Sequence, residues 1–387
     1  MSDRPAVLVL GTADWDQPIA TNQHYVARAL AEELDVTFVE SIGLRRPELS
    51  ARDVRRVVAR VRGARADLAP RARPAGMAVL SPKVVPHHTG PVRTLNARLL
   101  RRLVEPWLRR PGPRVLWAYS PVTYGLERLA DVTVYHCVDL LAEVPGISAD
   151  AVGAGERALA AAGAVAVASS PVVREHLERV GFAAPLLWPN VADVATITAA
   201  RPAGPAAGRS ARAVFAGNLS PTKVDFALLR ALVEAGVDLH LAGPVAEGGG
   251  AAGAEVASLV RSGATHHGLL SLDELARLYW TATVGLVPYL LNPYTTGVSP
   301  LKTFEYLAAG LHVVSTPVPA VTPVPGDVTV ASTTAGYVDA VRLTVDPDPA
   351  SLDRRSALAR AHSWDVRGAQ ARALVAQHVG DRERSDG

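Results

Sequence analysis

The segment TVGLVPYLLNPYTTGVSPLKTFEYLAAGLHVVS, residues 283–315, joins two short apolar runs through a polar loop and a helical pattern. Each run is rich in Val and Leu and is short enough to be a buried strand. Between the runs, Ser299 is a natural N-cap, Pro300 fits the first helical position and Gly310 closes the helix. A strand, a helix and a second strand in this order are typical of a parallel α/β sheet.

The same alternation continues along the whole chain. The apolar runs do not alternate strictly with polar residues, which indicates strands buried on both faces of a sheet. Strands are expected at residues 6–11, 35–40, 77–81, 114–119, 132–137 and 164–169, and again at 213–218, 237–243, 283–289, 311–315 and 327–332. The stretch between the two series is rich in Pro, Gly and Ala and predicts an interdomain linker.

With 387 residues the chain exceeds one hydrophobic core of ordinary size, so two domains are expected. The expected fold class is α/β, with two Rossmann-like, doubly wound domains that face each other across a cleft. Ligands of such sheets bind beyond the carboxyl ends of the strands, so the chemistry is expected between the halves. The expected parts are an N-terminal domain at 1–194, the linker at 195–212, a C-terminal domain at 213–362, and a final helix and tail at 363–387, the helix packing back on the N-terminal domain.

Composition narrows the class of protein. Hydrophobic residues make up 49% of the chain and charged residues 20%, the balance of a soluble globular protein. The single cysteine, Cys137, excludes a disulfide framework and favours a reducing compartment, so the cytoplasm is the default expectation. No apolar stretch approaches the roughly 20 residues that span a bilayer, so no transmembrane helix is expected.

Residues 51–75 carry most of the local positive charge, as eight arginines around a stripe of valines. As a basic amphipathic helix, this segment would give the protein a peripheral contact with the inner face of the membrane, or with an anionic acceptor. A solvated arginine face is the alternative. Nucleic acid is not expected, because no aromatic residues are interleaved with the arginines.

Lys302 stands in the first turn of the helix expected before Gly310, where the helix dipole disfavours a cation unless an anion lies nearby. Only three of the 40 basic residues are lysines, so the choice is unusual for this chain. Glu305 follows at i+3 and lies on the same helix face. The pair predicts a diphosphate at Lys302, with Glu305 accepting hydrogen bonds from a ribose diol. The alternative is a surface ion pair worth about a few tenths of a kcal/mol.

The stretch FAGNLSPTK, residues 215–223, resembles an anion site as well. A strand ends at Gly217, a turn passes through Asn218 and Ser220, and Lys223 is expected to open a helix. Backbone N–H groups at such a turn bind anions, and a lysine adds a point charge suited to phosphate. A structural turn with an exposed lysine is the alternative.

The first half offers polar residues after two of its expected strands. The loop after residue 11 contains Trp15, Asp16, Gln23 and His24, and donors and acceptors around one indole suit a polyhydroxylated acceptor. An ordinary capping loop explains these residues equally well.

His136 and Asp139 lie near the carboxyl end of the strand at 132–137, where a group that deprotonates an acceptor hydroxyl is expected. His136 could equally be a core histidine. The adjacent His87 and His88 point apart and have no acidic partner at ligand spacing, so no metal site is expected. The chain also lacks the glycine and serine motifs of NTPases, dehydrogenases and α/β hydrolases.

Residues 213–320, with FAGNLSPTK and the S-P-x-K-x-x-E-Y-x-A-x-G pattern from Ser299 to Gly310, resemble the donor-binding half of GT-B glycosyltransferases of family 4, in particular the bacterial teichuronic-acid or cell-surface-sugar type. WPNVAD at 188–193 and YHCVD at 135–139 are weaker echoes. The resemblance implies that Lys223 and Lys302 bind the diphosphate of a nucleotide sugar, that Glu305 binds the ribose, and that backbone from Gly268 to Leu270 binds the base. The implied donor set is completed by Asn218, Gly297, Val298 and Ser299. Asn218 and Gly297 depart from the family, which has a basic residue and a glutamate there.

The expected function is therefore transfer of a sugar from a nucleoside diphosphate sugar to a hydroxyl or amine acceptor, without metal or other cofactor. The acceptor would be a small molecule or a lipid-linked glycan. A nucleotide-sugar 2-epimerase and an inactive paralogue that serves as a binding or activating subunit remain open.

Overall fold

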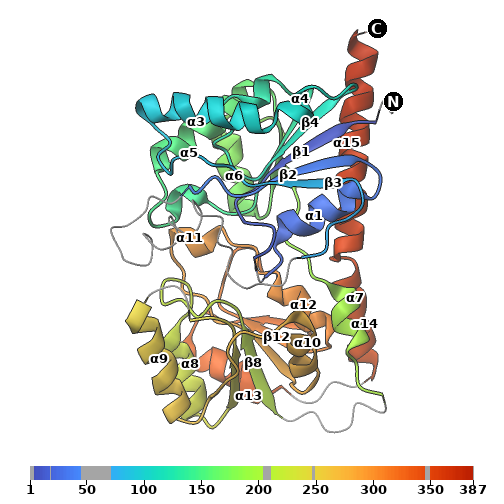
Figure 1. Ribbon diagram of the computed structural model, residues 1–387. Helices are drawn as coiled ribbons and strands as arrows, with labels where there is room; N and C mark the ends of the chain where they lie inside the picture. Colours follow the sequence, from blue (N-terminus) through green and yellow to red (C-terminus); the bar gives the residue numbers. More distant parts are fainter. Residues whose placement is uncertain are drawn as a thin grey trace. The chain divides into compact units, whose positions relative to one another are not determined.

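Figure 1 shows the computed structural model, which describes residues 4–17, 19–44, 71–203, 211–245, 249–344 and 349–386. The chain divides into two compact units, and each is described by itself. Unit 1 comprises residues 1–188 and 367–387, and unit 2 comprises residues 189–366. Each unit contains one parallel sheet with helices between its strands, so the predicted α/β class with two Rossmann-like sheets is confirmed.

In the described part of unit 1, seven strands form a parallel sheet in the order β3-β2-β1-β4-β5-β6-β7. The strands are β1 Ala6–Leu10, β2 Asp35–Val39, β3 Met77–Leu80, β4 Arg114–Ala118, β5 Val132–Cys137, β6 Val165–Ala168 and β7 Leu186–Leu187. Every residue of β1 is buried, because the strand lies inside the sheet with both faces covered. The strand order reverses between β1 and β4, which is where such a sheet opens a crevice at its carboxyl edge.

Most helices of unit 1 lie between consecutive strands of this sheet in the sequence. They are α1 Asn22–Ala31, α3 Gly90–Leu103, α4 Glu105–Leu108, α5 Ala149–Ala161, α6 Pro171–Val180 and the short 3-10 turns η1 Leu126–Arg128 and η2 Leu141–Glu143. The final helix, α15 Trp364–Asp386, belongs to unit 1 from Arg367 onward. Arg372 on α15 donates to the backbone carbonyl of Ala29 at 3.0 Å and to the carboxylate of Glu32 at 2.6 Å. These two hydrogen bonds hold α15 against α1.

Among the described residues of unit 2, six parallel strands follow the order β10-β9-β8-β11-β12-β13. The strands are β8 Arg212–Ala216, β9 Asp238–Ala242, β10 Thr265–His266, β11 Val284–Val287, β12 His312–Ser315 and β13 Val328–Val330. The helices are α7 Val194–Ala199, α8 Phe226–Glu234, α9 Gly249–Arg261, α10 Leu272–Trp280, α11 Pro293–Thr296, α12 Lys302–Ala308, α13 Thr334–Arg342 and α14 Pro349–Arg360. In this sheet the order reverses between β8 and β11.

The strand predictions are confirmed, with ends that shift by at most two residues. Two strands were missed, β7 and β10, because each has only two residues and therefore carries no pattern of its own. None of the helices within the described ranges is long and apolar enough to cross a membrane.

The predicted linker differs from the structure at its first half. Val194–Ala199 is a helix capped by Asp193, whose carboxylate accepts from the N–H of Thr196 at 3.1 Å. Ile197 of this helix is fully buried, and its carbonyl accepts from the indole N–H of Trp280 at 2.8 Å. One Val and one Ile among small residues are thus enough to place the helix in the core of unit 2.

The boundaries between the parts also differ from those expected. The chain crosses between units at residues 188–189 and 366–367, not near 194 and 362. In addition, α15 continues through the GDRERSD stretch, which was expected to be a tail, as far as Asp386.

Candidate functional site

The loops that follow β8 and β11 meet at the carboxyl edge of the sheet in unit 2, where the strand order reverses. The N–H of Leu290 donates to the carbonyl of Lys223 at 2.9 Å, and the side-chain amide of Asn292 donates to the carbonyl of Thr222 at 2.8 Å. The structure therefore joins the two segments that were predicted separately as anion sites.

Lys223 lies in the turn before α8, three residues ahead of the helix. The prediction that Lys223 opens this helix is wrong, because the carboxylate of Asp225 caps the N–H of Leu228 at 2.9 Å and α8 begins at Phe226. The Lys223 ammonium lies 4.6 Å from the centre of the Tyr289 ring, a cation–π distance. Tyr289 follows β11, so the contact holds the ammonium at the junction of the two loops.

The neighbouring turn after β8 is packed against the turn after β9. Gly243 has a φ of +135°, and a Cβ there would lie 1.9 Å from the carbonyl oxygen of Gly217, so glycine is required for this close approach. Asn218 is the residue after Gly217. Its side-chain oxygen is buried and accepts no hydrogen bond from any described residue. A buried polar atom without a partner is unusual, which makes the Asn218 side chain a candidate to bind a ligand.

The helix α12 begins later than predicted. Ser299 was expected to cap it, but the Ser299 hydroxyl accepts the backbone N–H of Asn190 at 3.0 Å, and the Asn190 side chain donates to the Ser299 carbonyl at 3.0 Å. The first helical residue is Lys302. Gly310 has a φ of +76°, which confirms it as the residue that ends the helix.

Lys302 and Glu305 form the ion pair that the i+3 spacing allows, but the pair is not a surface pair. The Lys302 Nζ lies 2.7 Å from Glu305 Oε2, with side chains only 19% and 7% exposed. The hydroxyl of Tyr279, on α10, donates to the same oxygen at 2.9 Å. Burial, and next the Glu305 charge, raise the pKa of Tyr279 well above its ordinary value, so this hydroxyl keeps its proton.

The Glu305 carboxylate is the partner of the Lys302 ammonium, and this explains in part why a cation lies at the start of α12. The other carboxylate oxygen, Oε1, accepts no hydrogen bond from the described residues. A polyol could therefore bind Glu305 without breaking the pair. Because α12 has only seven residues, side chains rather than a long helix dipole supply most of the local field.

Several backbone N–H groups around this pair also donate to no described residue. They belong to Ser299, Leu301 and Lys302 at the start of α12, and to Gly268, Leu269 and Leu270 after β10. Gly268 has a φ of +71°, and its carbonyl accepts the N–H of Gly243 at 2.7 Å. The turn expected to bind the base is thus anchored to the turn after β9. Gly297 and Val298, the remaining predicted donor residues, are buried in the same β11–α12 connection.

Tyr306 and Gly285 place α12 against the sheet, although the sequence indicated Tyr306 only as part of a motif and did not single out Gly285. The N–H of Ala216, at the end of β8, donates to the hydroxyl of Tyr306 at 2.9 Å. A Cβ at Gly285, on β11, would lie 2.2 Å from the Tyr306 ring. Tyr279 was missed as well. Each of these contacts joins residues far apart in the sequence, and a one-dimensional pattern carries no signal for them.

Replacing Gly285 by alanine is expected to lower the free energy of unfolding by about 1–3 kcal/mol, the usual cost of overpacking a core. The added methyl group would displace Tyr306 and with it α12. Urea denaturation measures the effect. Gly253→Ala on α9 is the matched control, because nothing lies within 4 Å of its added Cβ and alanine favours a helix. Equal stability of the two variants would contradict the role given to Gly285.

In unit 1, the loop after β1 turns its rings inward. Trp15 and His24 are fully buried, with ring centres 5.3 Å apart, and Trp15 packs edge-on against Phe38 at 5.1 Å. The two His24 ring nitrogens face the N–H of Thr21 and the carbonyl of Asp14. Burial lowers the pKa of His24 to about 4, so the ring is neutral at physiological pH.

The other two predicted acceptor residues tie the same loop together. The side-chain oxygen of Gln23 accepts the N–H of Thr12 at 2.8 Å, and the Asp16 carboxylate accepts the N–H of Arg71 at 2.9 Å. The polar groups of these residues therefore hold the loop itself together. Contact of Trp15, Asp16, Gln23 or His24 with an acceptor stays a prediction.

His136 lies near the end of β5, and Asp139 lies two residues beyond the strand. No hydrogen bond joins the two side chains. His136 is fully buried and stacks on Tyr119 at 4.9 Å, and both of its ring nitrogens lack a hydrogen-bond partner among the described residues. Burial, followed by the charge of Arg367, lowers the pKa of His136 well below its ordinary value. Asp139 is half-buried just beyond the strand. Their catalytic roles stay predictions.

Most of the basic segment at 51–75, which was predicted as a helix, lies outside the described residues, because these begin again at Arg71. The Arg71 guanidinium donates to the carbonyls of Trp15 and Gln17. The described ranges contain no group of three or more His, Cys, Asp or Glu side chains placed to hold a metal ion.

The chain has no match among known protein-family profiles or among curated protein sequences. Its structure does resemble solved structures over nearly its whole length. Sucrose-phosphate synthase from Thermosynechococcus elongatus is 16% identical with a TM-score of 0.66, covering 97% of this chain and 98% of its own. Anabaena HepE in complex with UDP-glucose is 13% identical with a TM-score of 0.62, covering 96% and 99%.

A UDP-forming trehalose-phosphate synthase from Burkholderia xenovorans is 14% identical with a TM-score of 0.62, covering 98% and 99%. These identities are too low to carry function, but the agreement in fold extends over both units. The chain has the two-unit, Rossmann-like α/β fold of the GT-B glycosyltransferases.

Proposed function

We propose that the chain is a glycosyltransferase that moves a sugar from a nucleoside diphosphate sugar to a hydroxyl or amine of an acceptor. The observation that carries the proposal is the set of side chains at the carboxyl edge of the sheet in unit 2. Lys223, Lys302 and Glu305 all lie in connections that follow β8 or β11, where a doubly wound sheet binds its ligand. HepE, of the same fold, was solved with UDP-glucose.

Each part of the donor has a suitable partner in unit 2. Lys302 and Lys223 would bind the diphosphate, assisted by the N–H groups of Ser299, Leu301 and Lys302, which have no partner among the described residues. Glu305 would accept from the ribose hydroxyls through Oε1. The backbone of Gly268, Leu269 and Leu270 would bind the base.

In the reaction, the bond from the anomeric carbon to the diphosphate oxygen breaks, and a bond to the acceptor oxygen or nitrogen forms. The acceptor proton passes to a base, for which Asp139 and His136 at the end of β5 are the candidates. The two lysines and the N–H groups would stabilise the charge that develops on the diphosphate, which is the largest contribution expected without a metal ion.

The enzyme subclass and the type of acceptor are proposed from the resemblance of residues 213–320 to family 4 glycosyltransferases. We propose a hexosyltransferase similar to family 4 enzymes that build cell-surface sugars. The acceptor, a small molecule or a lipid-linked glycan, would bind unit 1. Peripheral membrane contact through residues 51–75 belongs to the same proposal.

Calorimetric titration with UDP, GDP, ADP and dTDP in the presence of EDTA tests the proposal. We expect one of the four to bind with a Kd in the micromolar to millimolar range, because most of the charge compensation comes from the protein. If none binds, or if binding appears only on addition of Mg²⁺, the metal-independent donor site is wrong. Incubation of the protein with the sugar conjugate of the binding nucleotide then tests for slow hydrolysis, which an inactive subunit would not show.

A further inference from the structure

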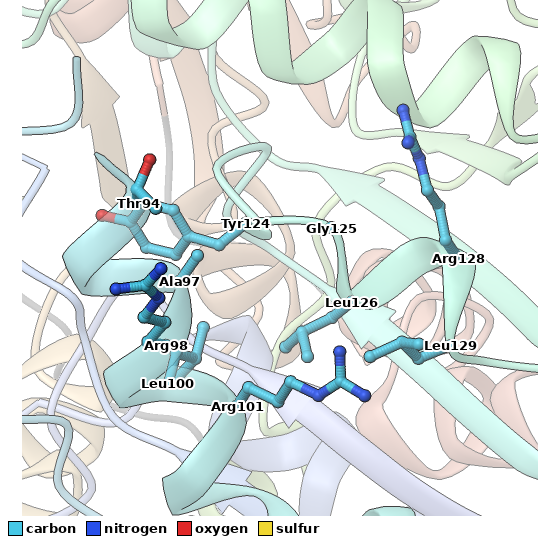
Figure 2. A pocket seen from close by; sticks show the side chains of 10 residues that line it. All are labelled: Thr94, Ala97, Arg98, Leu100, Arg101, Tyr124, Gly125, Leu126, Arg128 and Leu129. Atoms are coloured by element: carbon cyan, nitrogen blue, oxygen red, sulfur yellow. The ribbon is translucent and has the colours of Figure 1, made fainter. Parts of the chain in front are cut away.

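A separate pocket lies in unit 1, between α3 and the turn that leads into η1. Its volume is about 340 Å³. Figure 2 shows the side chains that line it: Thr94, Ala97, Arg98, Leu100 and Arg101 from α3, and Tyr124, Leu126, Arg128 and Leu129 with Gly125 from the turn and η1. None of these residues belongs to the donor set of unit 2 or to the loop after β1.

The inner wall of the pocket is apolar. Leu100 and Leu126 are 1% and 2% exposed and belong to the core of unit 1, and Ala97 and Leu129 lie beside them. The Tyr124 ring forms one side. The Tyr124 hydroxyl faces His88 and accepts from the side-chain amide of Asn96 at 3.1 Å, so the ring is held in place from behind.

The rim of the pocket is basic. Arg98 and Arg101 are one helical turn apart on α3, and in Figure 2 their side chains lie beside Tyr124 and Leu126, whereas Arg128 extends away from them. Neither Arg98 nor Arg101 forms an ion pair or hydrogen bond with any residue that the structure describes. The whole of α3, GPVRTLNARLLRRL, contains four arginines and no acidic residue.

An apolar cavity with two uncompensated guanidinium groups at its mouth matches an amphiphilic anion. Arginine binds phosphate through paired N–H groups, and two arginines at i and i+3 would bracket one phosphate. The leucines, the alanine and the tyrosine ring would cover a small apolar body attached to it. Inorganic phosphate would leave this wall exposed to water.

We propose that this pocket binds an organic phosphate monoester with a short apolar group, the phosphate on Arg98 and Arg101 and the apolar group against Leu100, Leu126 and Tyr124. The site does not depend on the proposed glycosyl transfer, since it uses other residues and its test reads binding alone. Such a ligand could be a soluble metabolite or the head group of phosphatidic acid, and both present a phosphate monoester.

The test is calorimetric titration with hexyl phosphate, compared with inorganic phosphate and hexanol. We expect hexyl phosphate to bind at least about tenfold more tightly than either fragment, and the double variant Arg98→Gln/Arg101→Gln to weaken it by about tenfold or more, as expected for lost charged hydrogen bonds. Ala97→Phe, which fills the pocket without changing charge, should abolish the advantage over inorganic phosphate.

Arg102→Gln is the matched control, because Arg102 is the next residue on α3, is exposed and does not line the pocket. If it weakens hexyl phosphate binding as much as either Arg98→Gln or Arg101→Gln alone, the helix is only a diffuse basic surface and the proposal is overturned. An equal affinity for hexyl phosphate and inorganic phosphate overturns it too.

Two further measurements assign the source of the phosphate. Binding to vesicles that contain phosphatidic acid but not to phosphatidylcholine vesicles, with competition by hexyl phosphate, supports a lipid ligand in this pocket. Binding of hexyl phosphate without binding to either vesicle supports a soluble ligand.

Discussion

Replacing Lys302 by alanine is expected to weaken binding of the donor nucleotide by about 1.5–3 kcal/mol, the range for a hydrogen bond to a charged group. The Lys302 ammonium is held 2.7 Å from the Glu305 carboxylate and is only 19% exposed, so it is already oriented and partly desolvated. Loss of such a charge costs more than loss of a freely solvated one. Calorimetric titration with the nucleotide that binds the wild type measures the change.

Two controls separate this effect from damage to the fold. Lys302→Gln removes the charge but keeps a donor for Glu305, and it should weaken nucleotide binding while the free energy of unfolding changes less than in Lys302→Ala. Lys83→Ala removes an exposed lysine of unit 1 and should leave nucleotide binding unchanged. Unchanged affinity in both Lys302 variants would show that the diphosphate lies elsewhere.

Replacing Asp327 by asparagine is expected to lower the free energy of unfolding by about 3–5 kcal/mol, the cost of breaking a buried ion pair. Asp327 is fully buried and accepts hydrogen bonds from Arg354 at 2.7 and 2.8 Å and from Arg355 at 2.9 Å. Arg355 is itself buried and also donates to the carbonyl of Gly310, just after α12, at 2.7 Å. The variant would leave the Arg355 charge without its carboxylate.

The contacts of Asp327 with Arg354 and Arg355 also predict how the free energy of unfolding depends on pH. Burial tends to raise the pKa of Asp327, but the hydrogen bonds and charges of Arg354 and Arg355 outweigh it and hold this pKa below its ordinary value of 3.8. The folded pKa is lower than the unfolded one. The contribution to stability is therefore present at pH above about 4 and is lost as the pH falls through the folded pKa.

Denaturation curves in urea at neutral pH and at about pH 3 measure both effects. Asp327→Asn should be less stable than the wild type at neutral pH and should lose less on acidification. Asp353→Asn, at an exposed position of α14, is the control and should behave as the wild type. A similar loss of stability in both variants would contradict the role assigned to the Asp327 network.

The fold could be predicted from the sequence because its longer strands are mainly apolar runs without strict alternation, and such runs are typical of strands covered on both faces. Strands of two residues, β7 and β10, carry no such pattern. The Val194–Ala199 helix was taken for a linker because its composition is that of a linker, whereas its one Ile is placed in the core by Trp280, more than 80 residues away.

The candidate site could be predicted only in its local part. The spacing of Lys302 and Glu305 gave their shared helix face, and the ion pair confirms it. Tyr279 was missed because its hydrogen bond to Glu305 depends on how α10 and α12 pack. The polar composition of the loop after β1 did not indicate that its rings are buried; His24 can be buried because it is neutral and both of its ring nitrogens have partners.

Amide hydrogen exchange in the presence and absence of UDP-glucose tests most directly whether the connections after β8, β10 and β11 together hold the donor. Among the described residues, the N–H groups of Gly268, Leu269, Leu270, Ser299, Leu301 and Lys302 have no hydrogen-bond acceptor, so a bound donor should slow their exchange. We expect UDP-glucose to slow exchange in peptides that cover 217–224, 266–271 and 297–306. Slower exchange only in peptides of unit 1, or no change with UDP-glucose and with the sugar conjugates of GDP, ADP and dTDP, would contradict the proposed donor site.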